Sequence, residues 1–273
     1  YGWKLLASSL LDTVYNNIRQ LIIGRMYTPS DLAFYNRGKQ FPDLIITNIN
    51  TSIDSVLLPT MSQEQENKER VKIMTRRAIK TSTYIMAPLM MGLAFCATPV
   101  IRLILTEKWL SCVPFMQIFC ITSMFYPVHT ANLNAIKAMG RSDAYLKLEI
   151  IKKVIGMALL LSTMWFGVMA MAYSLLVSSV LSQIINSWPN RKLLNYGYLE
   201  QLKDILPGII LAVVMGICVY PVQWLGLSDI IILCIQVPLG VIIYIIGSKI
   251  FKLESFEYIL DMIKPYILKI LHK

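Results

Sequence analysis

Long apolar blocks constrain this chain more than any other feature of its sequence. Eight blocks, most of them about 20 residues long, cover residues 5–24, 41–61, 79–105, 112–136, 147–166, 168–188, 205–224 and 229–248. A helix of about 20 apolar residues crosses the hydrocarbon core of a bilayer. The blocks therefore predict an all-α fold, a polytopic transmembrane helical bundle with about eight membrane-spanning helices.

The composition also indicates a membrane protein. Hydrophobic residues make up 56% of the chain and charged residues 15%, whereas soluble domains carry about 25% charged residues. The apolar runs lack the alternating ten-residue pattern of a membrane β-barrel. The connectors "FGV" and "LGLSD" contain Gly167 and Gly226, which are typical of helix ends between antiparallel helices.

Basic residues are distributed unevenly over the connectors between the blocks. With eight spans, 20 Lys and Arg residues fall on one side of the membrane, mainly within 62–80, 137–153, 191–203 and 249–273, and five fall on the other. Cytoplasmic loops of membrane proteins carry such an excess. We therefore expect a multi-pass membrane protein with both ends of the chain cytoplasmic, and we expect no nucleic-acid partner despite the net charge of +10.

The last segment, residues 251–273, is too polar to span a membrane. Phe256, Ile259, Leu260 and Ile263 share one face of a helix, and Glu254, Glu257, Asp261 and Lys264 share the opposite face. This pattern predicts an amphipathic helix on the cytoplasmic surface of the membrane. A helix that binds a partner protein is the alternative.

No motif of an enzyme or of a cofactor site is present in the sequence. There is no nucleophile–base pair, no glycine-rich phosphate loop, no CxxC motif and no metal-ligand spacing, and the chain has two histidines. The five cysteines fall mostly within apolar blocks, as small packing residues do. We therefore predict no catalytic residue, no metal and no cofactor.

The first apolar block carries polar residues that a simple membrane span would exclude. Asp12, Asn16, Arg19 and Gln20 share one half of a helix at about 100° per residue, and Asn17 falls outside this arc. A charge in hydrocarbon costs at least about 2.5–3.5 kcal/mol. The stripe should therefore face other helices or water, and Arg19 needs a partner, either Asp12 or a ligand anion.

The second block repeats the design, because Asp43, Thr47, Asn50 and Asp54 lie within about 60° of one another on a helix. Two striped helices can line one shared cavity. The substrate-cavity candidates are Arg19, Asp12, Asn16, Asn17, Gln20, Asn50 and Asp54. The alternative, favoured for Asn48, Asn132, Asn134 and Gln183, is that polar groups hold helices together by hydrogen bonds.

Four segments in order resemble one protein family. They are "YGWKLLASSLLDTVYNNIRQLIIGRMYTPSDLAFYNRGKQFP", "LLPTMSQEQENKERV", "EKWLSCVPFMQIFCI" and "KAMGRSD". Together they are similar to the second half of bacterial lipid-linked oligosaccharide flippases (lipopolysaccharide biosynthesis proteins) of the multidrug/oligosaccharidyl-lipid/polysaccharide exporter superfamily. The resemblance extends to about residue 205 and more loosely to the last two blocks.

The resemblance implies two six-helix lobes around a central cavity. Residues 1–190 would be the C-terminal six-helix transmembrane lobe, 191–250 two additional transmembrane helices, and 251–273 the cytoplasmic tail. The chain begins with Tyr1 instead of Met, and we expect it to be a piece of a longer protein whose N-terminal lobe is its main partner. Half a cavity is not expected to transport alone.

The function implied by the resemblance is transport across the bacterial inner (plasma) membrane. The cargo would be undecaprenyl-diphosphate-linked oligosaccharide for lipopolysaccharide, capsule or exopolysaccharide synthesis, and the partners would be membrane lipids and a polysaccharide polymerase or glycosyltransferases. Two alternatives stay open. One is a multidrug cation exporter of the same superfamily, which acidic residues such as Asp12, Asp43 and Asp54 would suit. The other is a membrane scaffold for glycan-assembly enzymes.

Overall fold

The computed structural model describes residues 2–271 and, within them, side chains at positions 6, 10, 13 and 17–264. Every regular element in this range is helical, which confirms the all-α class. The elements are α1 (Gly2–Met26), α2 (Pro29–Gln63), α3 (Lys68–Phe95), α4 (Ala97–Leu105), η1 (Glu107–Cys112), α5 (Val113–Ser123), α6 (Tyr126–Ala138), α7 (Ser142–Thr163), α8 (Val168–Leu193), α9 (Tyr198–Val219), η2 (Tyr220–Leu225), α10 (Asp229–Ile250) and α11 (Glu254–Leu271).

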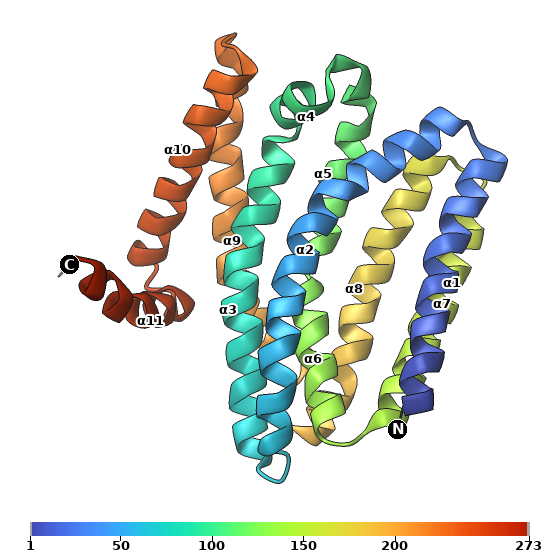
Figure 1. Ribbon diagram of the computed structural model, residues 1–273, viewed down its shortest axis with the longest axis vertical. Helices are drawn as coiled ribbons and strands as arrows, with labels where there is room; N and C mark the ends of the chain where they lie inside the picture. The colour runs from blue at the N-terminus through green and yellow to red at the C-terminus, as the bar shows by residue number, and fades with distance from the viewer. Residues whose placement is uncertain (1, 272–273) are drawn as a thin grey trace.

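Successive helices run alternately between two ends of the molecule (Figure 1). The connectors 64–67, 139–141 and 194–197 lie at the end where α1 begins. This end holds the strongly basic connectors, so the up-and-down order agrees with the charge distribution in the sequence. The assignment of this end to the cytoplasm remains a prediction.

Length and apolar character identify several of these helices as membrane spans. Four stretches satisfy both criteria among the described residues: 107–138, 168–193, 198–225 and 229–250. The pair α3–α4, bent by 69°, makes a fifth if it is one span. The helices α1 and α2 are long enough, but their polar stripes reduce their hydropathy. The chain is a membrane protein, and the count of eight spans remains a prediction.

The structure corrects the predicted extents of several segments. The stretch 62–77, which lies in a basic connector between the second and third predicted blocks, is helical except at 64–67. The Asn67 side chain accepts a hydrogen bond from Arg70 N (3.1 Å) and caps α3. The stretch 189–204 is likewise helical except at 194–197. The second predicted block, 41–61, is the lower part of a longer helix that begins at Pro29.

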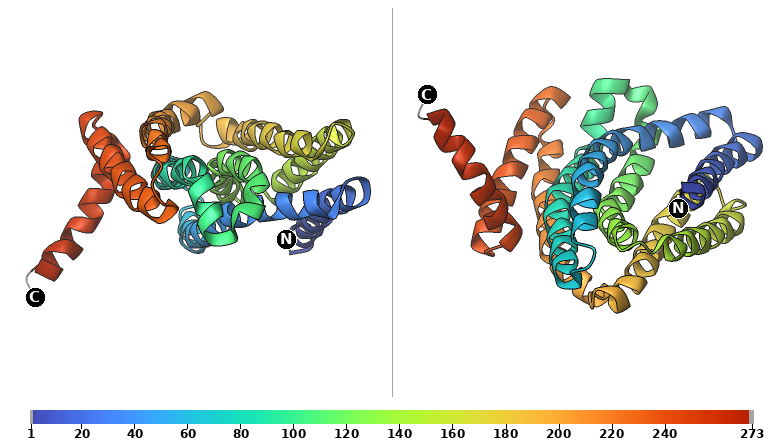
Figure 2. Two further views of the ribbon diagram at one scale, coloured as in Figure 1. Left: turned by 90° about the horizontal axis from the view of Figure 1, so that it is seen from above. Right: turned by 60° about the horizontal axis from the view of Figure 1, so that its bottom comes forward.

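The packing of the helices leaves α2 and α10 at the surface. Helix α2 packs on α5 and α6, α3 packs on α9, and α7 packs on α8 and α1. Helix α10 contacts mainly α9 and α4, and Figure 2 shows it at the edge of the bundle. The central apolar core is built from α3, α4, α5, α9 and α10, with Met86, Met90 and Met116 fully buried in it.

The tail folds as α11, which leaves the lower end of α10 sideways, away from the bundle (Figures 1 and 2). Phe256 and Ile259 are half-buried and pack against the central core. Glu257, Asp261 and Lys264 are exposed. Leu260 and Ile263, which belong to the same predicted apolar face, are exposed, so the bundle covers only the first part of that face, and a surface position of the helix on the membrane remains a prediction.

Candidate functional site

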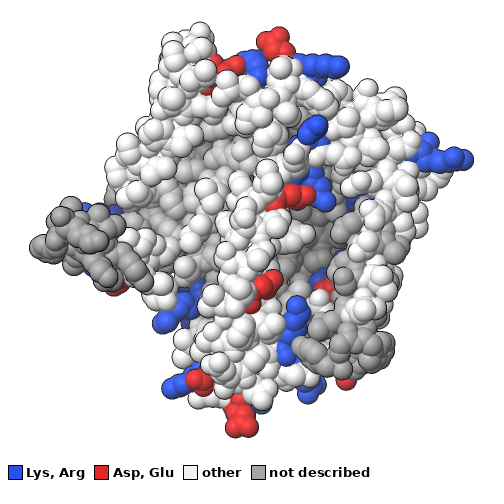
Figure 3. Space-filling view, viewed as in Figure 1, with Lys and Arg blue, Asp and Glu red and all other residues white. Residues whose placement is uncertain are grey.

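Helix α2 presents a polar face that no described helix covers. Gln40, Thr47, Thr51 and Asp54 are exposed along it, and Asp43 is half-buried. Figure 3 shows acidic and basic side chains over this part of the molecule, next to a hollow in its surface. The polar stripe predicted for the second block therefore lies on an open face.

A groove of about 760 Å³ lies along the first half of this face. One wall comes from α1 and one from α2, and the aromatic ring at its end comes from η1. Its lining residues are Gln20, Ala33, Asn36, Arg37, Lys39, Gln40, Asp43, Leu44, Thr47, Asn48 and Trp109. We call it the polar groove.

Local sequence features fix the position of α2 beside the groove. Thr28 and Asp31 form a reciprocal capping box, and Pro29 occupies the first turn, where its missing N–H is not needed. A side chain at Gly38 would lie 2.6 Å from Phe115 Cβ, so glycine permits the close approach of α2 and α5. Pro42 removes one backbone donor, a common cause of helix bending, and Figure 1 shows that α2 is bent.

The charges in the polar groove are mostly positive. Arg37 donates a hydrogen bond to Gln40 Oε1 (2.7 Å), and its guanidinium carbon lies 5.4 Å from the centre of the Trp109 ring. Lys39 pairs with Asp43 at 3.6 Å, four residues along the helix. Two cations and one carboxylate line the groove, so the charge of Arg37 is not balanced by a carboxylate there.

The hydroxyl and amide groups farther along α2 bond to their own helix. Thr47 donates to Asp43 O (2.8 Å), Asn48 to Leu44 O (2.8 Å) and Thr51 to Thr47 O (2.6 Å). Their remaining lone pairs and amide hydrogens point outward, where they can bind water or sugar hydroxyls. Such a face is unsuited to hydrocarbon.

Arg19 does not lie in the polar groove, in contrast to our expectation. Its side chain is buried, with 4% exposure. The guanidinium donates to Met171 O (2.5 Å) and to Ser174 Oγ (3.1 Å), both on α8. The cation is thus held by a carbonyl and a hydroxyl within the bundle, and the structure does not bring it together with Asn50 and Asp54.

The other predicted site residues are only partly brought together. Gln20 is exposed and lines the polar groove, and Asn17 is exposed on α1. Asn50 is half-buried, and its Oδ1 has no hydrogen-bond partner among the described residues. Asp54 accepts a hydrogen bond from Asn134 Nδ2 of α6 (2.6 Å). The side chains of Asp12 and Asn16 lie outside the described residues.

Sequence reasoning missed Arg37, Lys39 and Gln40 as residues of this face. It placed them in a connector, although the letters "TPSD" at Thr28–Asp31 are a helix-start signal. A helix that begins at Pro29 brings Asn36, Gln40, Asp43 and Thr47 onto one face. Among the described residues, no group of three or more His, Cys, Asp or Glu side chains is arranged to hold a metal ion.

Comparisons with known proteins relate this chain to polysaccharide biosynthesis proteins. The family model described as "Polysaccharide biosynthesis protein" matches residues 1–114, which include α1, α2 and the whole polar groove. The matched part is 114 of the 273 residues of the chain. The family match thus covers the part of the molecule whose open face is polar.

Two curated proteins are similar in sequence to most of the chain. An uncharacterized membrane protein in the cps region of Klebsiella pneumoniae is 25% identical over 263 residues, which cover 94% of this chain and 52% of that protein. The teichuronic acid biosynthesis protein TuaB of Bacillus subtilis is 21% identical over 82% of this chain and 46% of its own length. The chain spans about half the length of the curated relatives it matches.

A solved structure shows the same fold. The lipid II flippase MurJ, in an inward closed conformation, superposes with a TM-score of 0.75 at 17% sequence identity. The match covers 90% of this chain and 52% of that one. This similarity therefore extends through most of the helices described above.

Proposed function

We propose that the full-length protein containing this chain is a flippase that moves lipid-linked oligosaccharide across the bacterial inner membrane. On this proposal, residues 1–190 form one lobe of the transporter, 191–250 an added helix pair and 251–273 a surface helix. The observation that carries the proposal is the open polar face of α2. The fold shared with a lipid II flippase and the family match over residues 1–114 support it.

The chemistry of the polar groove suits such a cargo. A diphosphate is an anion that cannot enter hydrocarbon unaided. Arg37 offers a planar set of N–H donors that matches phosphate oxygens bidentately. Gln20, Gln40, Asn48 and Thr47 present groups that can bond to sugar hydroxyls. The prenyl chain of the cargo would remain in lipid.

Charge in the polar groove also discriminates against the rival transport function. A drug-cation exporter needs an uncompensated carboxylate in its cavity. Asp43 is the one carboxylate that lines the groove, and it pairs with Lys39. The surplus charge in the groove is therefore the Arg37 guanidinium, which attracts anions.

The test is complementation of a strain that lacks its own flippase. In the full-length protein, Arg37→Ala should reduce surface glycan about ten-fold, because one charge-assisted hydrogen bond contributes about 1.5–3 kcal/mol, while membrane protein levels stay normal. Arg37→Lys should rescue partly, because it keeps the charge and loses the planar fork. Arg25→Ala is the matched control: it is an exposed arginine at the same end of the molecule, outside the groove.

The accumulation of intermediates separates the proposal from its rivals. A flippase defect leaves completed lipid-linked oligosaccharide on the cytoplasmic side. A scaffold defect would instead stop its synthesis. Loss of resistance to cationic drugs with normal surface glycan would indicate a drug exporter.

Orientation in the membrane is part of the proposal. The basic end of the molecule would be cytoplasmic. A cysteine at Glu66 should then resist an impermeant thiol reagent in intact cells, and one at Ser228 should react. Labelling at position 66 and protection at position 228 would mean that the basic end is not cytoplasmic.

A further inference from the structure

The bent pair α3–α4 lacks two backbone donors that a regular helix would contain. Each N–H of an α-helix bonds to the carbonyl four residues earlier, and proline has no N–H. Pro88 lies inside α3, so Tyr84 O has no helical donor. Pro99 lies near the start of α4, across the 69° bend, and leaves Phe95 O without its donor in the same way. Unpaired carbonyls are costly inside a membrane protein, so both need donors from elsewhere.

Side chains of the last helices supply both missing donors. The Tyr244 hydroxyl of α10 donates to Tyr84 O (2.9 Å), and both residues are buried. The Gln223 amide of η2 donates through Nε2 to Phe95 O (2.6 Å). Elements α9, η2 and α10 together form what we call the α9–α10 hairpin, residues 198–250. The hairpin thus bonds to α3 at the two carbonyls that the prolines leave free.

Glycines permit close packing within this hairpin and between the hairpin and α3. A side chain at Gly216 of α9 would overlap the Phe95 ring beside the bend. A side chain at Gly247 of α10 would overlap Leu211 of α9. The hairpin is therefore a closely packed unit that fits against α3 at the bend, where the Gln223 amide meets its acceptor.

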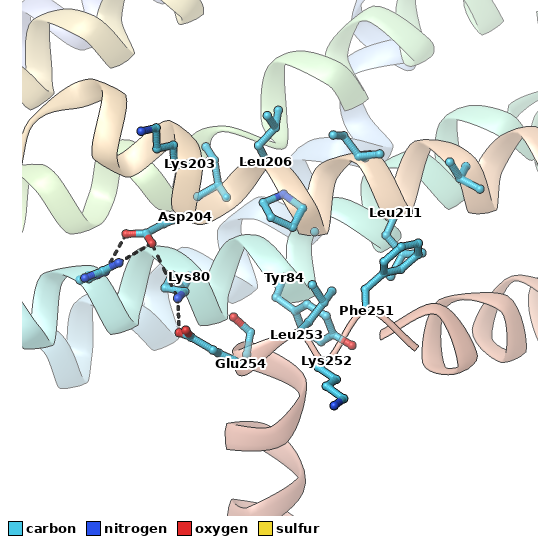
Figure 4. A pocket seen from close by; sticks show the side chains of 17 residues that line it. Lys80, Tyr84, Lys203, Asp204, Leu206, Leu211, Phe251, Lys252, Leu253 and Glu254 are labelled. Atoms are coloured by element: carbon cyan, nitrogen blue, oxygen red, sulfur yellow. Dashed lines mark hydrogen bonds and ion pairs between the residues drawn. The ribbon is translucent and has the colours of Figure 1, made fainter. Parts of the chain in front are cut away.

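Charged contacts hold the two ends of the same interface. At the basic end, a cleft of about 760 Å³ lies between α3, α9 and the α10–α11 junction, and Figure 4 shows ion pairs along its edge. Asp204 of α9 accepts two hydrogen bonds from Arg76 of α3, both 2.8 Å, and Lys80 of α3 lies 3.7 Å from Asp204. At the opposite end, Arg102 of α4 donates to Asp229 of α10 (3.1 Å). The hairpin is thus bonded to α3 and α4 from one end of the molecule to the other.

The direction of α4 after the bend matters for the polar groove. Helix α4 leads through Thr106 into η1, and Trp109 of η1 lines the end of the groove. Its ring lies against Arg37, whose guanidinium carbon is 5.4 Å from the ring centre. Contacts that fix the bend therefore also fix where Trp109 lies relative to Arg37.

From this arrangement we propose that the α9–α10 hairpin is a brace for α3–α4. Tyr244 and Gln223 are positioning residues that replace the donors missing at Pro88 and Pro99. Through α4 and η1, the brace holds Trp109 at the end of the polar groove. The replacement of the donors is independent of the proposed function, whereas its importance for cargo rests on that function.

A double-mutant cycle with Pro88 tests the replacement of the donor. In the purified full-length protein, Tyr244→Phe keeps the ring and removes the hydroxyl, so the midpoint of thermal unfolding should fall by a few degrees. In the Pro88→Ala background the loss should be much smaller, because the new backbone N–H at position 88 can bond to Tyr84 O. Pro189→Ala, which changes a proline inside α8, is the matched background, and the full loss should persist there.

Single substitutions test the brace even if Pro88→Ala does not fold. Gln223→Met removes the donor to Phe95 O at similar side-chain length and should also lower the midpoint. Tyr220→Phe is the control, because Tyr220 is 40% exposed and its hydroxyl bonds to no other described residue, and it should be neutral. Two results would overturn the proposal: an equal loss from Tyr244→Phe with and without Pro88, or a Tyr244→Phe protein as stable as Tyr220→Phe.

Fluorine NMR tests the positioning of Trp109. The full-length protein is labelled with 5-fluorotryptophan, and Trp109→Phe assigns the resonance. In the Tyr244→Phe/Gln223→Met variant this resonance should shift or broaden, whereas that of Trp165, in the connector between α7 and α8, should stay unchanged. An unchanged Trp109 resonance would contradict the positioning role. No cargo is involved, so this result is separate from success or failure of the transport proposal.

Discussion

Helices α2 and α10 each leave one long face uncovered in the described molecule, but the side chains on the two faces are opposite in kind. On α10 the uncovered face is aliphatic, with Ile235, Val237, Val241 and Ile242 among its exposed residues. On α2 it carries Gln40, Thr47, Thr51 and Asp54. Both faces are exposed in the described molecule. The aliphatic face of α10 suits lipid, whereas the polar face of α2 suits water.

The comparison also explains why the two arginines of this region differ in role. Arg19 lies in the interior of the bundle, where Nη1 donates to Met171 O and Ser174 Oγ of α8, and its Nη2 has no hydrogen-bond partner among the described residues. Arg37 stands on the open face and bonds only to a neighbouring Gln40 side chain and an aromatic ring among the described residues. A buried cation bonded to a neighbouring helix holds the two helices together, and a cation on an open face can bind a ligand.

The largest expected effect comes from placing the same charge on both faces. Val241→Lys, near the middle of α10, should cost about 2.5–3.5 kcal/mol if this face contacts hydrocarbon. Thr51→Lys on α2 should be nearly neutral if its face contacts water. Immunoblots of membrane fractions and thermal denaturation in detergent would measure both. Equal destabilisation of the two variants would contradict the difference in environment between the two faces.

Truncation of the buried arginine should have the next largest effect. Arg19→Ala removes charge-assisted hydrogen bonds to Met171 O and Ser174, and it should lower the free energy of unfolding by about 2–3 kcal/mol. Arg37→Ala should change it by less than about 0.5 kcal/mol, because surface substitutions rarely do more. Thermal denaturation of the purified variants compares them. A lower thermal stability of the Arg37→Ala protein would mean that Arg37 also stabilises the fold.

A glycine substitution tests how α2 is held in place. Gly38→Ala would force a Cβ to 2.6 Å from Phe115 Cβ and 2.9 Å from Cys112 O, and such overpacking costs about 1–3 kcal/mol. Gly92→Ala is the matched control, because its Cβ would meet only Met215 Cε at 3.9 Å. The control should be neutral or stabilising by a few tenths up to about 1 kcal/mol from helix propensity. Comparable destabilisation in both proteins would contradict the close-approach argument.

The sequence predicted the helical class and one stripe of the site, but not the partner of Arg19. The stripe of Asp43, Thr47, Asn50 and Asp54 follows from helix periodicity, which is local. The contact of Arg19 with Met171 and Ser174 joins residues more than 150 positions apart. A helical wheel gives the direction of a side chain on its own helix and not the neighbour that it meets, so Arg19 was grouped with the polar arc of its helix.

The smallest predicted effect concerns the contact at the lower part of the polar face. Asn134 Nδ2 donates to Asp54 Oδ1 at 2.6 Å, which links α6 to an otherwise open side chain. Hydrogen bonds between membrane helices contribute about 0.6 kcal/mol on average and at most about 1.7 kcal/mol. A double-mutant cycle of Asp54→Ala and Asn134→Ala should give a coupling energy in this range by thermal denaturation. A value near the average would mean that water reaches Asp54 and competes with Asn134, as the polar character of this face requires. A coupling well above that range would mean that Asp54 is shielded from water, and the open face of α2 would then end above this residue.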